Sequence, residues 1–238
     1  MKLLRRLRFV FAVVFSVFSA GSAYAHPHVW VTMETEVEMG DSKEILGFRH
    51  KWTFDETYTS FAVEGLDANG DGLYSEEELK PLAEANVESL KEFEYFTFPF
   101  IGDEKVALKD PVDYRMEYKD KLLTLYFTVP LVTPVPYEKI EDFSLAIYDP
   151  EMYVSLTFND KAPVKIVSAK PVGCTAHVGE SAAEAKDSIP SQPGENTNPS
   201  GSPVRSARQE RRRLARAAQA RSLRLLQYAE RIIIECKS

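Results

Sequence analysis

Apolar and polar residues alternate from Val29 to Met39, and no other feature of the sequence constrains the fold as strongly. A period of two is that of a β-strand with one buried face, so this segment predicts a half-buried strand. The polar face carries three glutamates. The apolar face is made by five residues: Val29, Val31, Met33, Val37 and Met39.

A second strand is expected after a turn at residues 39–43, and its pattern places five side chains on one face: Leu46, Phe48, His50, Trp52 and Phe54. Matching the two apolar faces in a hairpin pairs Val31 with Trp52 and Met33 with His50. The same register sets His28 opposite Asp55.

The rest of the chain predicts one helical unit and many short strands. Residues 55–64 have the pattern of a short helix or turn, and apolar residues recur every three or four positions from Ser75 to about Glu94, as in a helix. Strands are expected at 95–101, 112–118, 122–129, 143–148, 153–158 and 164–168. We therefore expect an α+β fold, with a mainly antiparallel, β-sandwich-like body at residues 26–178 and a helical insertion at about residues 55–94.

The first 25 residues have the organisation of a secretory signal peptide. Four basic residues precede the apolar stretch Phe9–Phe18, and Ala23-Tyr24-Ala25 supplies a small-x-small cleavage site. The apolar stretch is too short to span a bilayer, and no other membrane segment is evident. Cleavage after Ala25 would leave a mature chain that begins at His26 and lies in the bacterial periplasm.

Two segments near the C-terminus differ in composition from the rest. Residues 179–204 are rich in Ser, Pro, Gly, Asn and Glu, which predicts a disordered linker. Residues 205–238 combine a helix candidate, with eight arginines between Arg205 and Arg224, and a β-rich run at 231–235. The arginines could bind an anionic membrane surface or form a solvated face. Export and the formal net charge of −7 argue against nucleic acid as a partner.

The chain has two cysteines, Cys174 and Cys236, and in an exported protein we expect them to form a disulfide. Closing a loop of about 62 residues is worth roughly 4 kcal/mol in the chain-entropy model, and the bond would tie the closing strand to the body. The alternative is a thiolate metal site formed by Cys174 with His177.

Residues 67–78 read DANGDGLYSEEE and match the D-x-[DN]-x-[DN]-G-x5-E calcium loop at every specified position. The glycine at position six allows a sharp turn, and a single loop is more typical of a structural clip than of a calcium switch. The alternative is a solvated acidic turn. The spacing predicts that one Ca²⁺ is bound by Asp67, Asn69, Asp71, the carbonyl of Leu73 and Glu78.

The mature protein would open with His26 and His28, whose imidazoles and free amine offer up to three nitrogen donors to Ni²⁺, Co²⁺, Zn²⁺ or Cu²⁺. Pro27 has no amide proton, which excludes the copper chelate that uses deprotonated backbone nitrogens. Asp55, opposite His28 in the expected hairpin, is the next candidate ligand. His50 is either a further ligand or a hydrogen-bonded histidine of the core.

Four motifs together resemble one bacterial family: HPHVW at residues 26–30, WTFDE at 52–56, the calcium-type loop, and a closing strand that ends in Cys236. The resemblance covers the mature chain outside residues 179 to about 225. The family is labelled as the periplasmic or substrate-binding component of an uncharacterised ABC-type transport system, often encoded beside NicO-type nickel/cobalt transporters. The resemblance implies an exported accessory of transition-metal transport whose partner is a cytoplasmic-membrane transporter.

Three functions remain open at this point. The first is a periplasmic metal-binding accessory protein that is not an enzyme, since no hydrolase constellation such as G-x-S-x-G occurs. The second is a copper oxidoreductase or copper carrier, in which His26 and one of His28, His50 or His177 form a histidine brace. The third is a calcium-stabilised interaction module that docks through the arginine-rich helix and has no transition-metal role.

Overall fold

The computed structural model describes residues 27–179 and 229–237. The expected signal peptide, the linker after residue 179, the arginine-rich segment and His26 all lie outside these residues. Gly179, predicted to begin the linker, is instead the last residue of a strand. Within the described residues, two mainly antiparallel sheets share one hydrophobic core, and the helices are few. The α+β fold with a β-rich body, expected from the strand pattern, is therefore confirmed.

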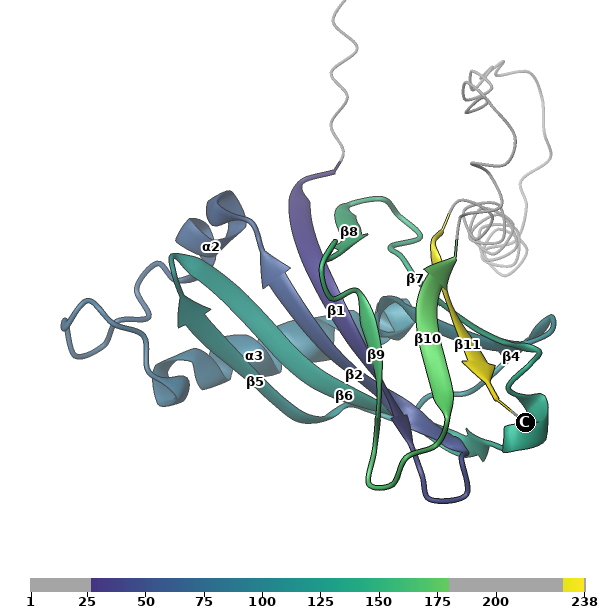
Figure 1. The fold of residues 1–238 in the computed structure, drawn as a ribbon. Coiled ribbons are helices and arrows are strands. Elements are labelled where there is room, and N and C mark those ends of the chain that lie inside the picture. The colour runs from purple at the N-terminus through teal and green to yellow at the C-terminus, as the bar shows by residue number, and fades with distance from the viewer. Residues whose placement is uncertain (1–26, 180–228, 238) are drawn as a thin grey trace, which may run out of the picture.

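The first sheet has the strand order β5-β6-β2-β1-β8, and β9 also pairs with β1 (Figure 1). Strands β8 and β9 both run parallel to β1, while the other pairs in this sheet are antiparallel. Its strands are β1 (Val29–Met39), β2 (Ile45–Phe54), β5 (Val112–Lys119), β6 (Leu122–Val135), β8 (Val154–Phe158) and β9 (Val164–Ser168).

The second sheet has the order β10-β11-β7-β3-β4. Its strands are β3 (Thr97–Ile101), β4 (Glu104–Lys105), β7 (Phe143–Ile147), β10 (Cys174–Gly179) and β11 (Arg231–Cys236). Strands β4 and β10 were not among those expected from the sequence.

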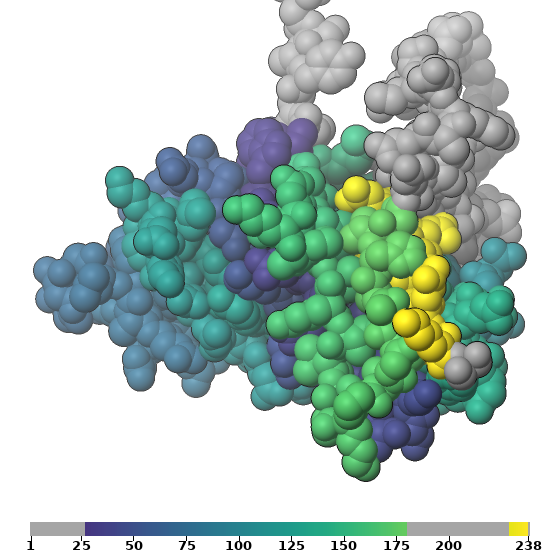
Figure 2. Space-filling view, in the orientation of Figure 1, coloured from purple at the N-terminus to yellow at the C-terminus, as the bar shows by residue number. Residues whose placement is uncertain are grey.

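The last described strand, β11, lies inside the second sheet, between β10 and β7, and appears in yellow beside β10 in Figure 2. Ile232 and Ile234 of this strand are buried in the common core. Cys174 and Cys236 occupy directly paired positions of β10 and β11, and their sulfur atoms are joined in a disulfide. The closing strand is therefore a central part of the body.

The helices are α2 (Glu56–Ala62) and α3 (Glu76–Leu90), with 3-10 turns η1 (Lys91–Phe96) and η2 (Tyr137–Lys139). Helix α3 packs along β5 and buries Leu79, Ala83 and Val87. Among the described residues, no helix combines the length and apolar character needed to cross a membrane.

The hairpin of β1 and β2 keeps the expected faces but not the expected register. Val31 pairs with Phe54, Met33 with Trp52 and Thr35 with His50, a shift of two residues from the pairing that apolar matching gave. The expected register would place the buried Thr35 hydroxyl opposite Phe48. The observed one places it opposite His50, which provides a hydrogen-bond partner.

Strand β6 also departs from expectation, because it continues past Val129 through Pro130 to Val135. A Cβ atom at Gly47 of β2 would lie 2.8 Å from the Val129 carbonyl oxygen and 2.9 Å from Pro130 Cα, so only glycine permits this approach. The register shifts at this point, with Ile45 buried and Leu46 exposed. The prediction that Leu46 lies on the apolar face was wrong for this reason.

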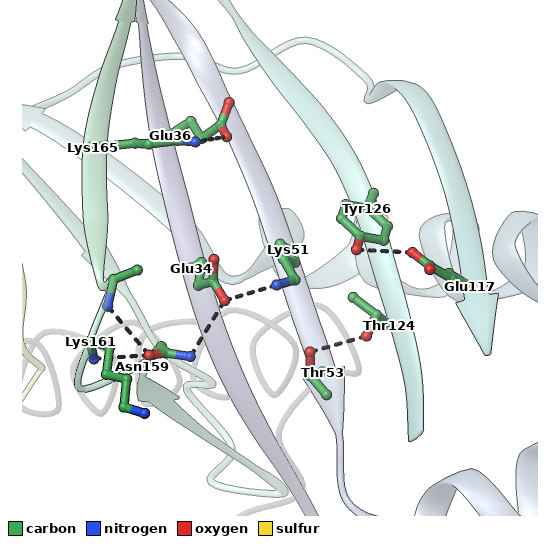
Figure 3. A network of polar contacts seen from close by, with 11 residues as sticks. Glu34, Glu36, Lys51, Thr53, Glu117, Thr124, Tyr126, Asn159, Lys161 and Lys165 are labelled. Carbon is green, nitrogen blue, oxygen red and sulfur yellow. Dashed lines mark hydrogen bonds and ion pairs between the residues drawn. The ribbon is translucent and has the colours of Figure 1, made fainter. Parts of the chain in front are cut away.

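The outer face of the first sheet is lined with ion pairs between neighbouring strands (Figure 3). The Lys51 ammonium lies 2.9 Å from the Glu34 carboxylate, and the Lys165 ammonium lies 2.8 Å from Glu36. The hydrogen bond to Glu34 raises the pKa of Lys51. These pairs satisfy the three glutamates that the sequence placed on the polar face of β1, together with Arg49, which lies 2.5 Å from Glu38.

Candidate metal centre

The calcium-type loop lies between α2 and α3 and projects from the edge of the molecule (Figures 1 and 2). Helix α2 ends at Ala62, and Gly65 then adopts a positive φ of 78°, so no helix runs directly into the loop. Gly70 and Gly72 also have positive φ values, 72° and 77°. Only glycine adopts this conformation freely, which is why glycines stand at these turns.

The Asp67 carboxylate holds the first half of the loop. It accepts backbone N–H groups from Gly70 at 2.8 Å, Asp71 at 3.1 Å and Gly72 at 2.9 Å. The Asp71 carboxylate in turn accepts the N–H of Leu73 at 2.8 Å. A carboxylate has about four lone-pair positions. The hydrogen bonds therefore shape the loop and still leave lone pairs with which the carboxylates could bind a cation.

Glu78 closes the loop from the first turn of α3. One carboxylate oxygen accepts the N–H of Ala68 at 2.9 Å, and the other accepts the N–H and hydroxyl of Ser75 at 2.9 and 2.8 Å. The hydroxyl of Ser75 also accepts the N–H of Glu78, which completes a capping box. The donors from Ser75 hold the pKa of Glu78 below its usual range, and the carboxylate is therefore ionised at neutral pH.

The loop is anchored to the body on its C-terminal side. The ring of Tyr74 lies against that of Tyr118 in β5, with centroids 4.7 Å apart, and Leu79 is buried one turn later. On its N-terminal side, the Tyr58 hydroxyl of α2 donates to the Asn86 side chain of α3 at 3.0 Å. The five proposed calcium ligands thus lie on a short segment with both ends fixed, although no three His, Cys, Asp or Glu side chains of the described chain form a ready metal-holding group.

His28 lies at the start of β1 and faces β8 instead of Asp55. Its backbone N–H donates to the Tyr153 carbonyl at 2.9 Å, and its exposed ring lies 4.8 Å from the Tyr153 ring. The predicted placement of His28 opposite Asp55 was wrong, because the two-residue shift of register brings Trp30 to that position: the Asp55 N–H donates to the Trp30 carbonyl at 2.9 Å.

Asp55 has a structural task that its sequence context could have revealed. Its carboxylate caps α2 by accepting the N–H groups of Thr57 at 2.8 Å and Tyr58 at 3.0 Å, and it also accepts the N–H of Trp30 at 2.9 Å. An aspartate between a strand and a helix is a common N-cap. The WTFDE motif therefore joins β2, α2 and the start of β1.

His50 is fully buried, and both ring nitrogens have partners. Nδ1 lies 3.1 Å from the Thr35 hydroxyl and Nε2 lies 3.2 Å from the Thr97 hydroxyl, which itself donates to the Tyr95 carbonyl. Since that hydroxyl has one proton, Nε2 must donate to it and Nδ1 must accept from Thr35. Burial lowers the pKa of His50 to about 3. His50 is thus a neutral core residue that bridges the sheets. Of the two roles expected for it, the structure has the hydrogen-bonded core histidine, and the metal-ligand role does not fit a ring with both nitrogens paired.

His177 lies on β10, exposed, and opposite Ile233 of β11. The sulfur of Cys174 is bonded to Cys236 and cannot act as a thiolate. This excludes the alternative site of Cys174 with His177. The disulfide had been expected because the two cysteines belong to a chain with the pattern of an exported protein.

Comparison with known proteins gives a family and two relatives. A family model described as "Protein of unknown function (DUF1007)" matches residues 11–236. An uncharacterized protein of Haemophilus influenzae is 26% identical over 156 residues, which are 65% of this chain and 73% of the relative. An uncharacterized 15.5 kDa protein encoded in the trpE 3' region of Spirochaeta aurantia is 28% identical over 100 residues, 42% of this chain and 70% of the relative. None of these descriptions names an enzymatic activity.

Proposed function

The chain belongs to the DUF1007 family, whose description states no function, and we propose that it is an exported metal-binding accessory protein of transition-metal transport that carries one structural calcium ion. The observation that carries the calcium part is the shape of the loop at residues 67–78. Asp67 gathers the backbone of its first half, and Glu78 reaches back from α3 to Ala68.

Calcium fits this loop by charge as well as by spacing. Asp67, Asp71 and Glu78 place three carboxylates on one short exposed segment, and Glu76 and Glu77 add two more. Carboxylate, amide and carbonyl oxygens are the ligands that Ca²⁺ prefers, and a divalent cation would relieve the repulsion between them. Because α3 is already packed against β5, the ion would clip the loop to the helix and leave the fold unchanged.

Calcium binding is tested by native mass spectrometry and by the melting temperature at millimolar calcium. We expect one Ca²⁺ per chain and a stabilisation of about 1.4 kcal/mol when free calcium is tenfold above the dissociation constant. Both effects should be lost in Asp67→Asn/Asp71→Asn. Glu76→Gln/Glu77→Gln removes the same charge from the same loop at positions that the motif does not use, and should keep them. Equal losses in the two double variants would contradict the loop assignment.

The transition-metal part of the proposal concerns the start of the mature chain. It is supported by the exposed ring of His28 beside Tyr153, two residues after the His26 that signal cleavage would make the first residue. An amine and two imidazoles suit Ni²⁺, Co²⁺, Zn²⁺ or Cu²⁺. Asp55, whose carboxylate already accepts three backbone N–H groups, is not part of the proposed ligand set.

The periplasmic location and the link to an ABC-type or NicO-type transporter belong to the same proposal and come from the sequence resemblance. The test is elemental analysis of the exported, untagged protein beside His26→Ala/His28→Ala, with His177→Ala as a control for an exposed histidine elsewhere. One transition metal, lost in the double variant alone, supports delivery of that ion. Copper at this site with oxygen reactivity would favour the oxidoreductase, and calcium alone in every sample would contradict a transition-metal role.

A further inference from the structure

A cavity of about 250 Å³ opens between the start of β1, the end of β2, the last turns of α3, η1 and the segment that leads into β8. No residue of the calcium-type loop lines it, and neither does His28, whose ring lies 4.8 Å from that of the lining residue Tyr153. Concave sites with mostly apolar walls and a few polar groups are the usual form of small-molecule sites. The cavity is therefore a candidate binding site that the proposed metal sites do not use.

Aromatic side chains are the main kind in the wall. Six of the fourteen lining residues are aromatic: Trp52, Phe54, Tyr58, Phe93, Phe96 and Tyr153. Tyr58 and Phe93 are half-buried and Tyr153 is 49% exposed, so these three side chains can contact a ligand. The face of an aromatic ring carries partial negative charge and attracts a cation, and several rings around one space are typical of sites for alkylated ammonium groups.

The charges of the wall also favour a cation. Asp149 and Glu151 line the cavity, and its described lining contains no Lys, Arg or His. Among the described residues neither carboxylate has a cationic partner, whereas Glu34 and Glu36 on the outer face of the first sheet are each paired with a lysine. Charges interact over longer distances than direct contact, and more strongly beside an apolar wall than in bulk water. The two carboxylates therefore attract a cation in the cavity without having to touch it.

The neutral polar side chains of the wall are bonded within the protein. The Tyr58 hydroxyl donates to the Asn86 side chain at 3.0 Å, and the Asn86 amide donates to the Leu82 carbonyl at 2.9 Å. The Ser89 hydroxyl donates to the Asn86 carbonyl at 2.8 Å. A ligand rich in hydroxyl or amide groups would give up its hydrogen bonds to water and find few replacements there. A quaternary ammonium group has no N–H to satisfy, so it fits a wall of this composition.

On two sides of the cavity the backbone is held in a strained conformation by hydrogen bonds. The lining residue Phe96 has φ 51°, and Met152, between two lining residues, has φ 61°. Residues other than glycine adopt this region at a cost, mainly where the surroundings enforce it. The Phe96 carbonyl accepts the Tyr148 N–H at 3.1 Å, and the Met152 N–H donates to the Asp149 carbonyl at 3.1 Å. The wall is therefore shaped before a ligand arrives.

We propose that this cavity binds a free small organic cation that carries a quaternary ammonium group. The aromatic side chains contact the group, and the carboxylates of Asp149 and Glu151 attract it. The headgroup of a choline lipid has the same ammonium group but also a phosphate, which the two carboxylates would repel. The ligand is therefore a free cation and not a membrane surface. The site requires neither calcium nor a transition metal, so its test is independent of the function proposed above.

Three soluble probes separate the contributions of shape and charge, with dissociation constants measured by isothermal titration calorimetry on the mature, exported protein. Choline has the quaternary ammonium, 3,3-dimethylbutanol is its neutral analogue with carbon in place of the nitrogen, and phosphocholine adds an anionic phosphate. Choline should bind at a single saturable site per chain. The neutral alcohol and phosphocholine should each bind about tenfold more weakly than choline.

Three results of these titrations would overturn the proposal. The first is the absence of saturable choline binding at millimolar concentration. The second is binding of the neutral alcohol as tight as that of choline, which would mean that the cavity selects only for an apolar body. The third is binding of phosphocholine at least as tight as that of choline, which would point to a lipid headgroup.

Two charge-matched variants locate the site. Glu151 is exposed at the cavity, whereas Glu138 is exposed in η2 and does not line it. Glu151→Gln should weaken choline binding by about threefold to tenfold and leave binding of the neutral alcohol unchanged, while Glu138→Gln should change neither. Equal weakening in the two variants would show that choline responds only to the net charge of the chain, and the proposal would be overturned.

Tyr153→Leu tests the contribution of an aromatic ring. Tyr153 is half exposed, and leucine keeps an apolar side chain at its position. The variant should weaken choline binding about tenfold and change binding of the neutral alcohol little, because only the cation interacts with the charge distribution of the ring. If choline binding were the same in this variant and in the wild type, the aromatic side chains would not form the site and the proposal would be wrong.

Discussion

The buried bridge around His50 and the exposed loop at residues 67–78 each contain candidate metal ligands that the sequence suggested: His50 in the bridge, and Asp67, Asn69, Asp71 and Glu78 in the loop. In the bridge, made by Thr35, His50 and Thr97, every side-chain N–H and O–H donor has an acceptor, and both ring nitrogens of His50 are paired. In the loop, the carboxylates accept backbone N–H groups and stay in contact with water.

This difference separates a structural polar cluster from a candidate ion site. Burial makes the charged form of His50 unfavourable, so a core cluster must be neutral and complete. The solvent-accessible carboxylates of the loop need no such completion, because water can satisfy their remaining lone pairs and a cation could replace that water. Variants of the bridge should therefore lower the free energy of unfolding with or without calcium. Variants of the loop should change stability mainly when calcium is present.

The largest effect is expected from Thr97→Val. Thr97 is fully buried, and its hydroxyl both accepts from His50 and donates to the Tyr95 carbonyl. The change leaves two buried polar groups without partners, and we expect the free energy of unfolding to fall by about 2–4 kcal/mol. Urea denaturation, with and without calcium, measures it.

The matched control is Thr53→Val, since the Thr53 hydroxyl lies 3.1 Å from that of Thr124 on the half-buried outer face. There water can replace the lost partner, and the cost should be below about 1 kcal/mol. Similar losses of unfolding free energy in the two variants would mean that the buried bridge is no more sensitive to a lost hydroxyl than a half-buried surface pair.

Acid should lower the free energy of unfolding, because His50 is neutral in the folded protein and binds a proton when the chain unfolds. The pKa of His50 is about 3 in the folded protein and 6.5 ordinarily. As the pH falls below 6.5, the unfolded chain binds a proton that the folded chain does not, so stability decreases by up to about 1.4 kcal/mol per pH unit. From pH 7 to pH 5 this amounts to about 2 kcal/mol, measured by urea denaturation.

The His50→Gln variant isolates this contribution, because the carboxylates of the protein titrate in both chains. Its loss of stability between pH 7 and pH 5 should be smaller than that of the wild type by nearly the whole 2 kcal/mol, as an order of magnitude. An equal pH dependence in the two chains would show that His50 can be protonated in place.

On the loop side, Ser75→Ala tests how much of the shape exists without calcium. The Ser75 hydroxyl accepts the Glu78 N–H and donates to the Glu78 carboxylate. Removing an N-cap of this kind costs about 1 kcal/mol, which should appear in the calcium-free protein. Ser89→Ala, an exposed serine near the other end of α3, should leave the unfolding midpoint in place. Equal changes would mean that the capping box contributes nothing to the loop.

Much of the architecture followed from local pattern. The period of two located β1 and β2, β9 was predicted at its observed bounds, and the apolar spacing from Ser75 predicted where α3 begins. Local patterns did not predict which strands pair when they are distant in the sequence. The insertion of β11 beside β7 and the parallel pairing of β8 with β1 depend on which edges are free after the sheets form.

The same distinction between local and distant contacts applies to the two candidate metal sites. The loop is contiguous, so its five proposed calcium ligands could be inferred from the spacing alone. The His28 and Asp55 pair required a register, and apolar faces match equally well after a shift of two residues. The deciding information was polar: Thr35 interrupts the apolar face of β1, and only one register gives it a buried partner in His50.

The smallest effects test that register directly. In the observed hairpin Glu34 pairs with Lys51 and Glu36 with Arg49, whereas the apolar match would pair Glu34 with Arg49. Double-mutant cycles with Gln should give coupling energies of about 0.2–1 kcal/mol for the first two pairs, decreasing in high salt because these side chains are partly exposed. The cycle of Glu34 with Arg49 should give a coupling close to zero. If that cycle gave the largest coupling of the three, the hairpin would have the register of the apolar match, Thr35 would face Phe48, and the His50 bridge would lose the partner on which the comparison rests.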